Sequence, residues 1–419
     1  MYYGISKKLK YFCLNLNFEI FFALIKQSPN ILFMYLFDKS RHGRQNFKIS
    51  TNKPKLKWKR DLRTNPTYGA ESTAVIDDLG NLYFGSHSGN FYSLSKIGEI
   101  RWTFSTSTKI YSSPVLIEKL VFFAGGDGIL YCLDLEGNLV WKRDLTKPSE
   151  KMFKKKTINK WIHFPFTYDF HKKRNINYKC WSSPNYFEEN IYITAYGKGL
   201  YCINLRGEVI WSFDLGFPRF QLSGVAIDQE GNVYCSSRSG CIYSFKKNGI
   251  LNWKILIKKN WENWGNPVFC DIKKFAYFFF SKKEKEGLLV CVDPAGQILW
   301  KLELGSIRGS CAISKDGESI FCCDLDGYIY RVSSKNGEIE VKKKITEAQR
   351  GLWITPTIDL NSNILLATKD SNTTGRVILM NPDFEFIWEF NTNKVLSIPI
   401  ISQEGDLFFG SWDGYYYCL

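Results

Sequence analysis

The sequence predicts an all-β fold: an eight-bladed β-propeller made of four-stranded antiparallel blades. Two observations carry this prediction. First, a phrase in which Gly is followed by aliphatic residues and then Trp recurs along the chain, from Gly98 to Trp102, Gly137 to Trp141, Gly207 to Trp211, Gly249 to Trp253 and Gly296 to Trp300. Second, short runs rich in Val, Ile, Phe, Tyr and Trp alternate with turns that contain Gly, Asp and Asn. Repeat units of about 40 residues bury their apolar faces only against their neighbours.

Each unit has the same internal order of four short runs. A stretch such as 112–116 opens the unit, with Pro114 where an edge strand tolerates it. A second run such as 81–85 follows, a tight Gly turn leads to a third run such as 128–133, and the Gly-to-Trp phrase forms the fourth. Runs of this composition with such turns are strands joined as hairpins, and four strands make one propeller blade.

The number of blades follows from counting the hairpin between the second and third strands. Eight hairpins are expected, at 82–94, 121–133, 191–203, 233–245, 276–292, 320–332, 364–380 and 407–419. Eight fourth-strand anchors accompany them, at Trp58, Trp102, Trp141, Trp211, Trp253, Trp300, the degenerate Val341, and Trp388. Trp58 precedes the first hairpin and no Trp follows the last one. The strand at 56–62 is therefore expected to complete the last blade and close the ring, which removes open sheet edges.

The repeat resembles that of the pyrroloquinoline-quinone (PQQ) repeat superfamily, which shares the fold of quinoprotein alcohol dehydrogenases. The phrases at 85–94 and 410–419, with the pattern Gly-x-x-x-Gly-x-x-Tyr-x-Leu, match it best, and the resemblance covers residues 55–419. It implies one of two functions. The superfamily contains dehydrogenases that bind PQQ and calcium, and also cofactor-free propellers such as the scaffold lipoprotein of the bacterial outer-membrane β-barrel assembly machinery. Fold alone does not choose between them.

The quinoprotein alternative is suggested by the adjacent pair Cys322 and Cys323, since the dehydrogenases hold such a pair as a disulfide against the cofactor. Here the pair falls in a predicted second strand, where adjacent side chains point to opposite faces. We interpret both as small strand residues. The calcium ligands and catalytic aspartate of the dehydrogenases have no counterparts that we can place, so no cofactor, metal or catalytic residue is assigned. PQQ plus calcium is expected only under the alternative.

The remaining cysteines and the histidines indicate packing rather than metal binding. Cys132, Cys202, Cys291 and Cys418 share one slot in the third strand, where a small apolar residue fits between blades. The four histidines have no zinc-ligand spacing and no Cys-x-x-Cys occurs. Scattered cysteines without an evident export signal favour a reducing compartment, so we expect a cytoplasmic location.

Positive charge gathers in two appendages of the repeat. Residues 1–60 have a net charge of +11 and residues 151–179 a net charge of +8, so the rest of this +15 chain is about −4. The second appendage is an insertion at about 147–179 that mixes lysines with aromatic residues. It is expected on the face that carries the turns between second and third strands. Basic residues interleaved with aromatics suit nucleic acid, an acidic protein or an anionic lipid surface, while a simple lid is the alternative.

The first appendage, residues 1–52, is expected to be a separate extension, with the propeller spanning 53–419. Its apolar run is interrupted by Asn15, Asn17 and Glu19, which argues against a signal peptide. A membrane-surface segment, or translation starting at Met34, are the alternatives that the sequence leaves open.

Together these features predict a monomeric, non-catalytic binding or scaffold propeller. Its expected partner is a protein with an acidic or extended surface, and nucleic acid or an anionic membrane surface are kept as alternatives through the basic appendages. The first candidate residues for partner binding lie on the insertion: Trp161, Phe164, Lys172, Lys173 and Arg174. The second group lies on turns of the same face: His87, Asp127, Asp326 and Trp412. Such aspartates are turn formers first and ligands second.

Overall fold

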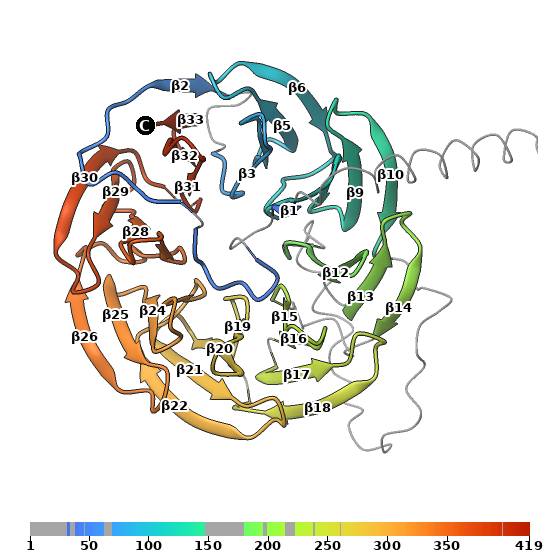
Figure 1. Ribbon diagram of the computed structural model, residues 1–419, viewed down its shortest axis with the longest axis vertical. Helices are drawn as coiled ribbons and strands as arrows, with labels where there is room; N and C mark the ends of the chain where they lie inside the picture. Colours follow the sequence, from blue (N-terminus) through green and yellow to red (C-terminus); the bar gives the residue numbers. More distant parts are fainter. Residues whose placement is uncertain are drawn as a thin grey trace, which may run out of the picture.

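Eight antiparallel sheets stand around a central axis in the computed structural model, and they form the expected propeller (Figure 1). The structure describes residues 32–33, 38–45, 47–62, 69–146, 180–195, 199–213, 223–237, 239–259, 261–395 and 397–419. Within these ranges no helix is long and apolar enough to cross a bilayer. Seven of the sheets have four strands, and one has a fifth strand on its inner edge.

Each blade is a meander that runs from the channel outwards. The strands of blades 1 to 4 are β3 (Val75–Ile76), β4 (Leu82–Gly85), β5 (Asn90–Leu94) and β6 (Ile100–Ser105); β7 (Val115–Ile117), β8 (Leu120–Ala124), β9 (Ile129–Asp134) and β10 (Leu139–Asp144); β11 (Asn185–Phe187), β12 (Asn190–Ala195), β13 (Gly199–Asn204) and β14 (Val209–Phe213); and β15 (Ala226–Ile227), β16 (Val233–Ser236), β17 (Cys241–Phe245) and β18 (Leu251–Leu256). The extra strand β1 (Leu32–Phe33) pairs with β7.

Blades 5 to 8 repeat the arrangement. Their strands are β19 (Val268–Cys270), β20 (Phe275–Lys282), β21 (Glu286–Val292) and β22 (Ile298–Leu304); β23 (Ala312–Ile313), β24 (Ser319–Cys323), β25 (Tyr328–Ser333) and β26 (Ile339–Lys344); β27 (Thr357–Ile358), β28 (Ile364–Ala367), β29 (Gly375–Met380) and β30 (Phe386–Thr392); and β31 (Ile400–Ile401), β32 (Leu407–Gly410), β33 (Tyr415–Cys418) and β2 (Trp58–Asp61).

The ring closes through β2, as predicted. This strand pairs antiparallel with β33, with Trp58 opposite Cys418, so the last blade is built from both ends of the repeat. A second closure contact is a hydrogen bond of 2.9 Å from the Trp388 indole N–H to the carbonyl oxygen of Ser50. The residues just before β2 therefore also take part in the closure.

The Gly-to-Trp phrase joins neighbouring blades. Each indole N–H donates to a carbonyl oxygen of the next blade, as from Trp102 to Leu135 at 2.8 Å. The next Gly lies against the same ring: a Cβ on Gly137 would come within 2.6 Å of Trp102, and its φ is +89°. In blades 1 to 7 a β-bulge directly precedes the anchor position, which turns the anchor side chain toward the neighbouring blade. The Gly-to-Trp phrase therefore mediates the contact between neighbouring blades.

Residues that lie near Val341 in space compensate for the missing Trp at this degenerate anchor. At the position of the next Gly stands Phe384, which is fully buried and has a φ of +64°. Its ring belongs to the same apolar cluster as Val341 and occupies the space that an indole takes elsewhere. The missing N–H is replaced by Arg331, whose Nη1 donates to Pro382 O at 2.9 Å. The loss of the Trp and the loss of the Gly therefore go together.

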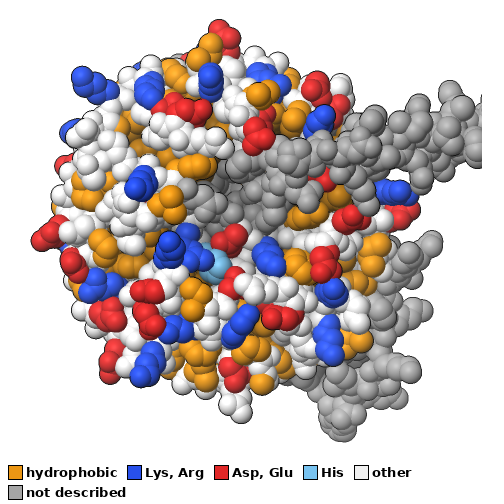
Figure 2. All heavy atoms as spheres, viewed as in Figure 1, with side chains coloured by type: hydrophobic (Ala, Val, Ile, Leu, Met, Phe, Trp, Pro, Cys, Tyr) orange, Lys and Arg blue, Asp and Glu red, His pale blue; other side chains and the backbone are white. Residues whose placement is uncertain are grey.

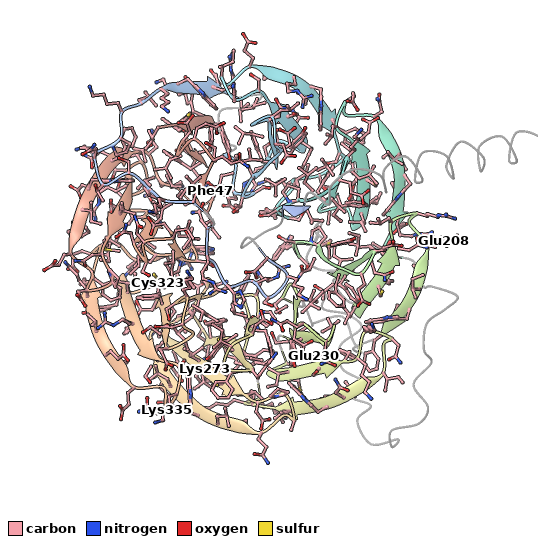
Figure 3. The ribbon with its side chains drawn as sticks, in the orientation of Figure 1. Phe47, Glu208, Glu230, Lys273, Cys323 and Lys335 are labelled. Carbon is pink, nitrogen blue, oxygen red and sulfur yellow. The ribbon has the colours of Figure 1, made fainter. Side chains whose placement is uncertain are left out.

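The core consists of apolar clusters between adjacent blades. Cys132, Cys202, Cys291 and Cys418 each lie in such a cluster, as their shared slot predicted. Cys322 and Cys323 point into two different clusters, on opposite faces of β24, and both thiols are free. Cys323 is labelled in Figure 3. Burial raises the pKa of Cys322 to about 12. The pair is a packing feature of this strand.

Residues 38–45 and 47–49, here called the axial segment, lie along the inner wall of the ring (Figure 1; Phe47 is labelled in Figure 3). The carbonyl oxygens of Lys39, Ser40, His42 and Gly43 accept hydrogen bonds from the backbone N–H groups of Ile227, Phe269, Ile313 and Ile358. These donors belong to the inner strands of blades 4 to 7. The axial segment thus pairs sheet edges that would otherwise stay open. The division into an extension and a propeller at residue 52 stays a prediction, but these residues pack on the blades.

Candidate functional site: the open end of the channel

The two ends of the channel are built differently. The turns between first and second strands, such as the one that carries Asp271, lie at the end covered by the axial segment. The opposite end carries the turns between second and third strands and the entry into each inner strand. Six residues at one repeat position surround a hollow of about 200 Å³ at this open end, and we call them the mouth ring: Glu71, Tyr111, Trp181, Trp264, Arg308 and Trp353.

A sequence pattern that recurs in the repeat determines where the mouth ring lies. In blades 2, 3, 5 and 7 the aromatic residue stands three positions before a Pro that opens the inner strand, as in 111–114 and 181–184. Since Pro favours an extended residue before it, the entry is straight and the aromatic side chain projects at the start of the strand. Tyr111, Trp181, Trp264 and Trp353 are all half-buried, so part of each ring remains open to solvent.

The rings of the mouth ring contact one another around the channel. The centroids of Tyr111 and Trp181 are 5.7 Å apart, and Trp181 stacks on Trp264 at 6.3 Å. The guanidinium of Arg308 lies 3.6 Å from the centroid of Trp264 and 5.0 Å from that of Trp353, which is cation–π geometry. The open end therefore presents aromatic faces and one guanidinium in a nearly continuous arc.

A belt of polar side chains lies below the mouth ring and links the blades. Backbone N–H groups donate to a side-chain oxygen at the same position of the next blade: Thr73 to Ser113 at 3.0 Å, Ser113 to Ser183 at 2.9 Å, Gly224 to Asn266 at 2.6 Å, Ser310 to Thr355 at 2.8 Å and Ile398 to Thr73 at 3.2 Å. These bonds fix the floor of the hollow. Among the described residues, Ser310 Oγ is buried without a hydrogen-bond partner.

The axial segment bridges the belt where it is interrupted. Gly224 has no side chain, and a Cβ there would lie 2.4 Å from Asn266 Oδ1 and 3.1 Å from Nη2 of Arg41. Arg41 is 1% exposed and donates to the carbonyl oxygens of Val225 and Ser183. At the second interruption, Ile398, Gln45 donates to Thr357 Oγ1 and accepts from Ile401 N–H at 2.8 Å.

An ionic cluster holds the start of the axial segment on the ring. His42 Nδ1 lies 2.7 Å from Asp38 and Nε2 lies 3.2 Å from Asp271. Burial lowers the pKa of His42, but the two carboxylates outweigh burial and the nearby Arg44, and the pKa rises to about 9. The pKa of Asp271 is lowered: burial opposes this shift, and hydrogen bonds from His42 and Ser40 outweigh it. Protonated His42 therefore ties the axial segment to the turn between β19 and β20.

Two of the predicted turn residues lie beside the mouth ring. His87 Nε2 is 3.0 Å from Glu71 Oε2, and the imidazole ring lies 4.6 Å from Tyr111. Trp412 lies 5.9 Å from His87, edge to face, and Lys394 Nζ sits 3.6 Å above its ring. These contacts extend the aromatic arc toward blades 1 and 8.

The other two predicted turn residues are separate from this arc. Asp127 accepts from the Tyr131 hydroxyl at 2.8 Å and from Ile129 N–H at 3.1 Å, so it stabilises its own turn. Asp326 lies in a second hollow on the same face. Trp161, Phe164, Lys172, Lys173 and Arg174 fall outside the described residues. The flanks of the insertion lie at this face, since Leu145 N–H donates to the turn residue Gly128 at 2.9 Å and Cys180 directly precedes Trp181.

The donor groups at the open end do not fit the calcium site that the quinoprotein alternative implies. Calcium takes six to eight oxygen ligands, usually with several carboxylates. Among the described residues that line the hollow, Glu71 supplies the one carboxylate, and it is beside His87. Across the described residues no group of three or more His, Cys, Asp or Glu is arranged to hold a metal ion. Cys322 and Cys323 are buried between blades and do not line the hollow.

The chain is an eight-bladed β-propeller, and its repeat is similar to the PQQ-like repeat. The family model described as "Outer membrane protein assembly factor BamB" matches residues 49–158. Among curated proteins, the uncharacterised protein YxaL of Bacillus subtilis is 40% identical over 62 residues. That match covers 15% of this chain and 15% of YxaL.

Solved structures share the fold at low identity. The structure of BamB from Moraxella catarrhalis has a TM-score of 0.62 and 14% identity, covering 87% of this chain and 96% of that one. Quinohemoprotein alcohol dehydrogenase from Comamonas testosteroni has a TM-score of 0.69 and 11% identity, covering 94% and 82%. The computationally designed Ika8 protein has a TM-score of 0.61 and 9% identity, covering 86% and 98%. BamB, an enzyme and a designed protein thus share this architecture.

Proposed function

We propose that this chain is a non-catalytic scaffold propeller that binds a partner protein at the open end of its channel. The observation that carries the proposal is the mouth ring, where Tyr111, Trp181, Trp264 and Trp353 form half-buried aromatic surface around Arg308. Trp, Tyr and Arg are the residues most enriched at the energetic centres of protein interfaces. Aromatic rings that are already packed lose little side-chain entropy on binding.

The rest of the channel supports binding rather than turnover. The belt holds the floor of the hollow by hydrogen bonds between blades, and the axial segment covers the other end. A rigid surface with one open side suits a partner that inserts a short segment. The match to the assembly-factor family model over residues 49–158 favours the same class of function.

The basic insertion at about 147–179 is part of this proposal. Its flanks lie at the open end, so Trp161, Phe164, Lys172, Lys173 and Arg174 are proposed to add an aromatic and positively charged contact for an acidic or extended partner. A cytoplasmic location is also proposed, supported by the free, buried cysteines among the described residues.

The direct test compares partner retention by four proteins purified from native cells. Trp264→Ala combined with Trp353→Ala should release the partner, and deletion of residues 150–179 should weaken its retention. Leu79→Ala combined with Leu360→Ala is the matched control, because these exposed apolar residues lie on turns at the closed end. Equal retention by the mouth-ring variant and the control would contradict the proposal. If only the insertion deletion has no effect, the insertion is a lid.

The quinoprotein alternative is tested by adding PQQ and calcium to the same protein. The proposal expects no thermal stabilisation and no dye reduction with alcohols, because the donor set at the open end is poor in carboxylates. Stabilisation together with turnover would establish the enzyme instead.

A further inference from the structure

A second hollow of about 810 Å³ lies at the open end, over blades 5 to 7. Four cationic side chains line it, Lys283, Lys285, Arg350 and Lys369, with two carboxylates, Glu284 and Asp326. The hollow joins the mouth ring, because the Trp353 ring lies near both Arg308 and Arg350 at 5.0 and 5.7 Å. The charge balance of this lining is positive.

Glu284 occupies the centre of this charge cluster. One of its carboxylate oxygens pairs with Arg308 and the other pairs with Arg350. Arg308 has a side chain that is only 5% exposed, whereas that of Arg350 is 52% exposed. The two guanidinium groups therefore converge on one carboxylate at the edge of the hollow. Arginine pairs are well suited to carboxylates, since their planar donors match the two oxygens.

The backbone that presents this arrangement is strained. Lys283 and Glu284 have φ values of +49° and +58°, and Arg350 has a φ of +59°. The left-handed region favours Gly, Asn or Asp, and none of these residues is used at the three positions. Non-glycine residues in this region persist where the surroundings hold them, and they cluster at functional sites.

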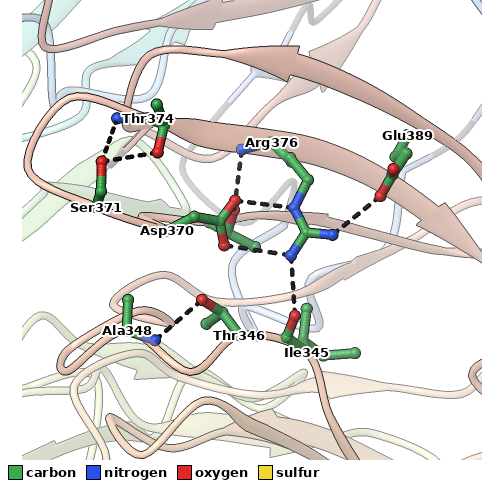
Figure 4. Close-up of polar contacts among 9 residues, drawn as sticks. Ile345, Thr346, Ala348, Asp370, Ser371, Thr374, Arg376 and Glu389 are labelled. Atoms are coloured by element: carbon green, nitrogen blue, oxygen red, sulfur yellow. Dashed lines mark hydrogen bonds and ion pairs between the residues drawn. The ribbon is translucent and has the colours of Figure 1, made fainter.

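Neighbouring contacts hold the segment that carries Arg350. Its N–H donates to Leu325 O at 2.9 Å. Below it, Arg376 pairs with Asp370 and Glu389 and donates to Ile345 O at 2.9 Å, while Ala348 N–H bonds to Thr346 Oγ1 (Figure 4). The bonds at Ile345 and Thr346 hold the chain just before Arg350, and the pairs with Asp370 and Glu389 hold the Arg376 side chain that makes one of them. The site is thus preorganised.

We infer that Arg308 and Arg350 form a carboxylate-binding site for an acidic segment of the partner protein, and that Glu284 is an internal stand-in which the partner's carboxylate displaces. The occupant is an acidic peptide because the group that the two guanidiniums already hold is a carboxylate. The four cations of the hollow complement further acidic residues of such a segment. The inference rests on the proposed protein-binding function and adds the chemistry of the partner.

The experiment measures binding of a fluorescent glutamate-rich peptide to the full chain at low ionic strength. Glu284→Gln removes the competing carboxylate and should tighten binding by roughly tenfold. This factor corresponds to the free energy of one hydrogen bond to a charged group. Arg350→Gln should weaken binding by a similar factor. Its guanidinium is half-exposed, so this variant is expected to fold. Lys335→Gln is the control, an equal change of charge at an exposed turn outside the hollow (Figure 3).

Two results would overturn the inference. One is a Glu284→Gln variant, or a folded Arg350→Gln variant, that binds the peptide as the Lys335→Gln control does. The other is an oligothymidylate that binds as tightly as the peptide and competes with it, which would assign the hollow to nucleic acid. The proposed function can also stand while this inference fails. That is the case if the variant with Trp264→Ala and Trp353→Ala loses the native partner but Glu284→Gln leaves peptide binding unchanged.

Discussion

The two ends of the channel differ although the same backbone repeat builds both. At the closed end, His42 of the axial segment pairs with Asp38 and with Asp271 on the turn between β19 and β20. At the open end, half-buried aromatic rings stack on one another and on Arg308. The closed end is thus held by ion pairs and hydrogen bonds of the axial segment, and the open end keeps apolar surface partly uncovered. The comparison separates the residues expected to determine stability from those expected to determine binding.

Charge on the one face shown in Figure 2 is mixed in sign. On the face shown in Figure 2, Lys and Arg side chains are interspersed with Asp and Glu rather than gathered by sign. An interspersed surface favours solubility and provides little attraction for one class of partner. Specific recognition is therefore expected from local clusters such as the mouth ring.

The largest expected effect is at Arg41. Arg41→Met should lower the free energy of unfolding by about 4 kcal/mol, since breaking a buried charged contact leaves the carbonyl oxygens of Ser183 and Val225 without this donor. Denaturant unfolding measures it. Arg206→Met on an exposed turn is the control and should change stability by less than about 0.5 kcal/mol. Equal effects would mean that the contacts of Arg41 with the blades add nothing to the stability of the ring.

His42 should make the closed end sensitive to alkaline pH. Its pKa is about 9 in the folded chain and about 6.5 unfolded, so its contribution is full below pH 6.5 and is lost as the pH rises through 9. The contribution is about 3 kcal/mol by linkage. Unfolding measured from pH 6 to 10 should show the difference between the wild type and His42→Gln shrinking with pH. A constant difference would contradict the raised pKa.

Two neighbouring hydroxyl groups of the belt can be compared, and the expected effect on stability is smaller than at His42. Thr355→Val removes the acceptor for Ser310 N–H and should cost about 1 kcal/mol of unfolding free energy. Ser310→Ala removes a hydroxyl with no partner among the described residues and should leave stability within about 0.5 kcal/mol. If Ser310→Ala is the more damaging of the two, the hydroxyl has a role that these contacts do not show.

The smallest expected effect on stability is at the mouth ring. Trp181→Ala should lower the free energy of unfolding by under about 1 kcal/mol because the ring is only half-buried, although core Trp substitutions cost several times more. Trp211→Ala, in the core at 2% exposure, is the comparison. Thermal unfolding of both variants distinguishes a binding surface from a structural one, and a similar loss at both positions would make the mouth ring part of the core.

The fold was predictable because its signal is repeated. The eight hairpins and the closure by β2 follow from the spacing of the Gly-to-Trp phrase, and the structure confirms them. The compensation at Val341 was hidden, since Phe384 and Arg331 replace the Trp only through contacts in space. The axial segment was hidden for another reason. Much of its pairing with the blades uses backbone carbonyls, which any sequence provides.

The candidate site was predictable only in part. The turn residues chosen from the sequence include His87 and Trp412, which lie beside the mouth ring. The ring itself was missed because its members vary from Glu71 to Arg308 and so escape a search for identical residues. An available signal was the aromatic residue three positions before Pro in four blades, at Tyr111, Trp181, Trp264 and Trp353.

Photo-crosslinking in native cells tests whether a partner protein binds at the open end of the channel. A photoreactive phenylalanine analogue would replace Trp353 at the open end or Leu360 at the closed end, positions only seven residues apart in sequence. We expect a discrete protein adduct from position 353 and none from position 360. Adducts of the same size from both positions, or only from position 360, would contradict a partner-binding site at the open end.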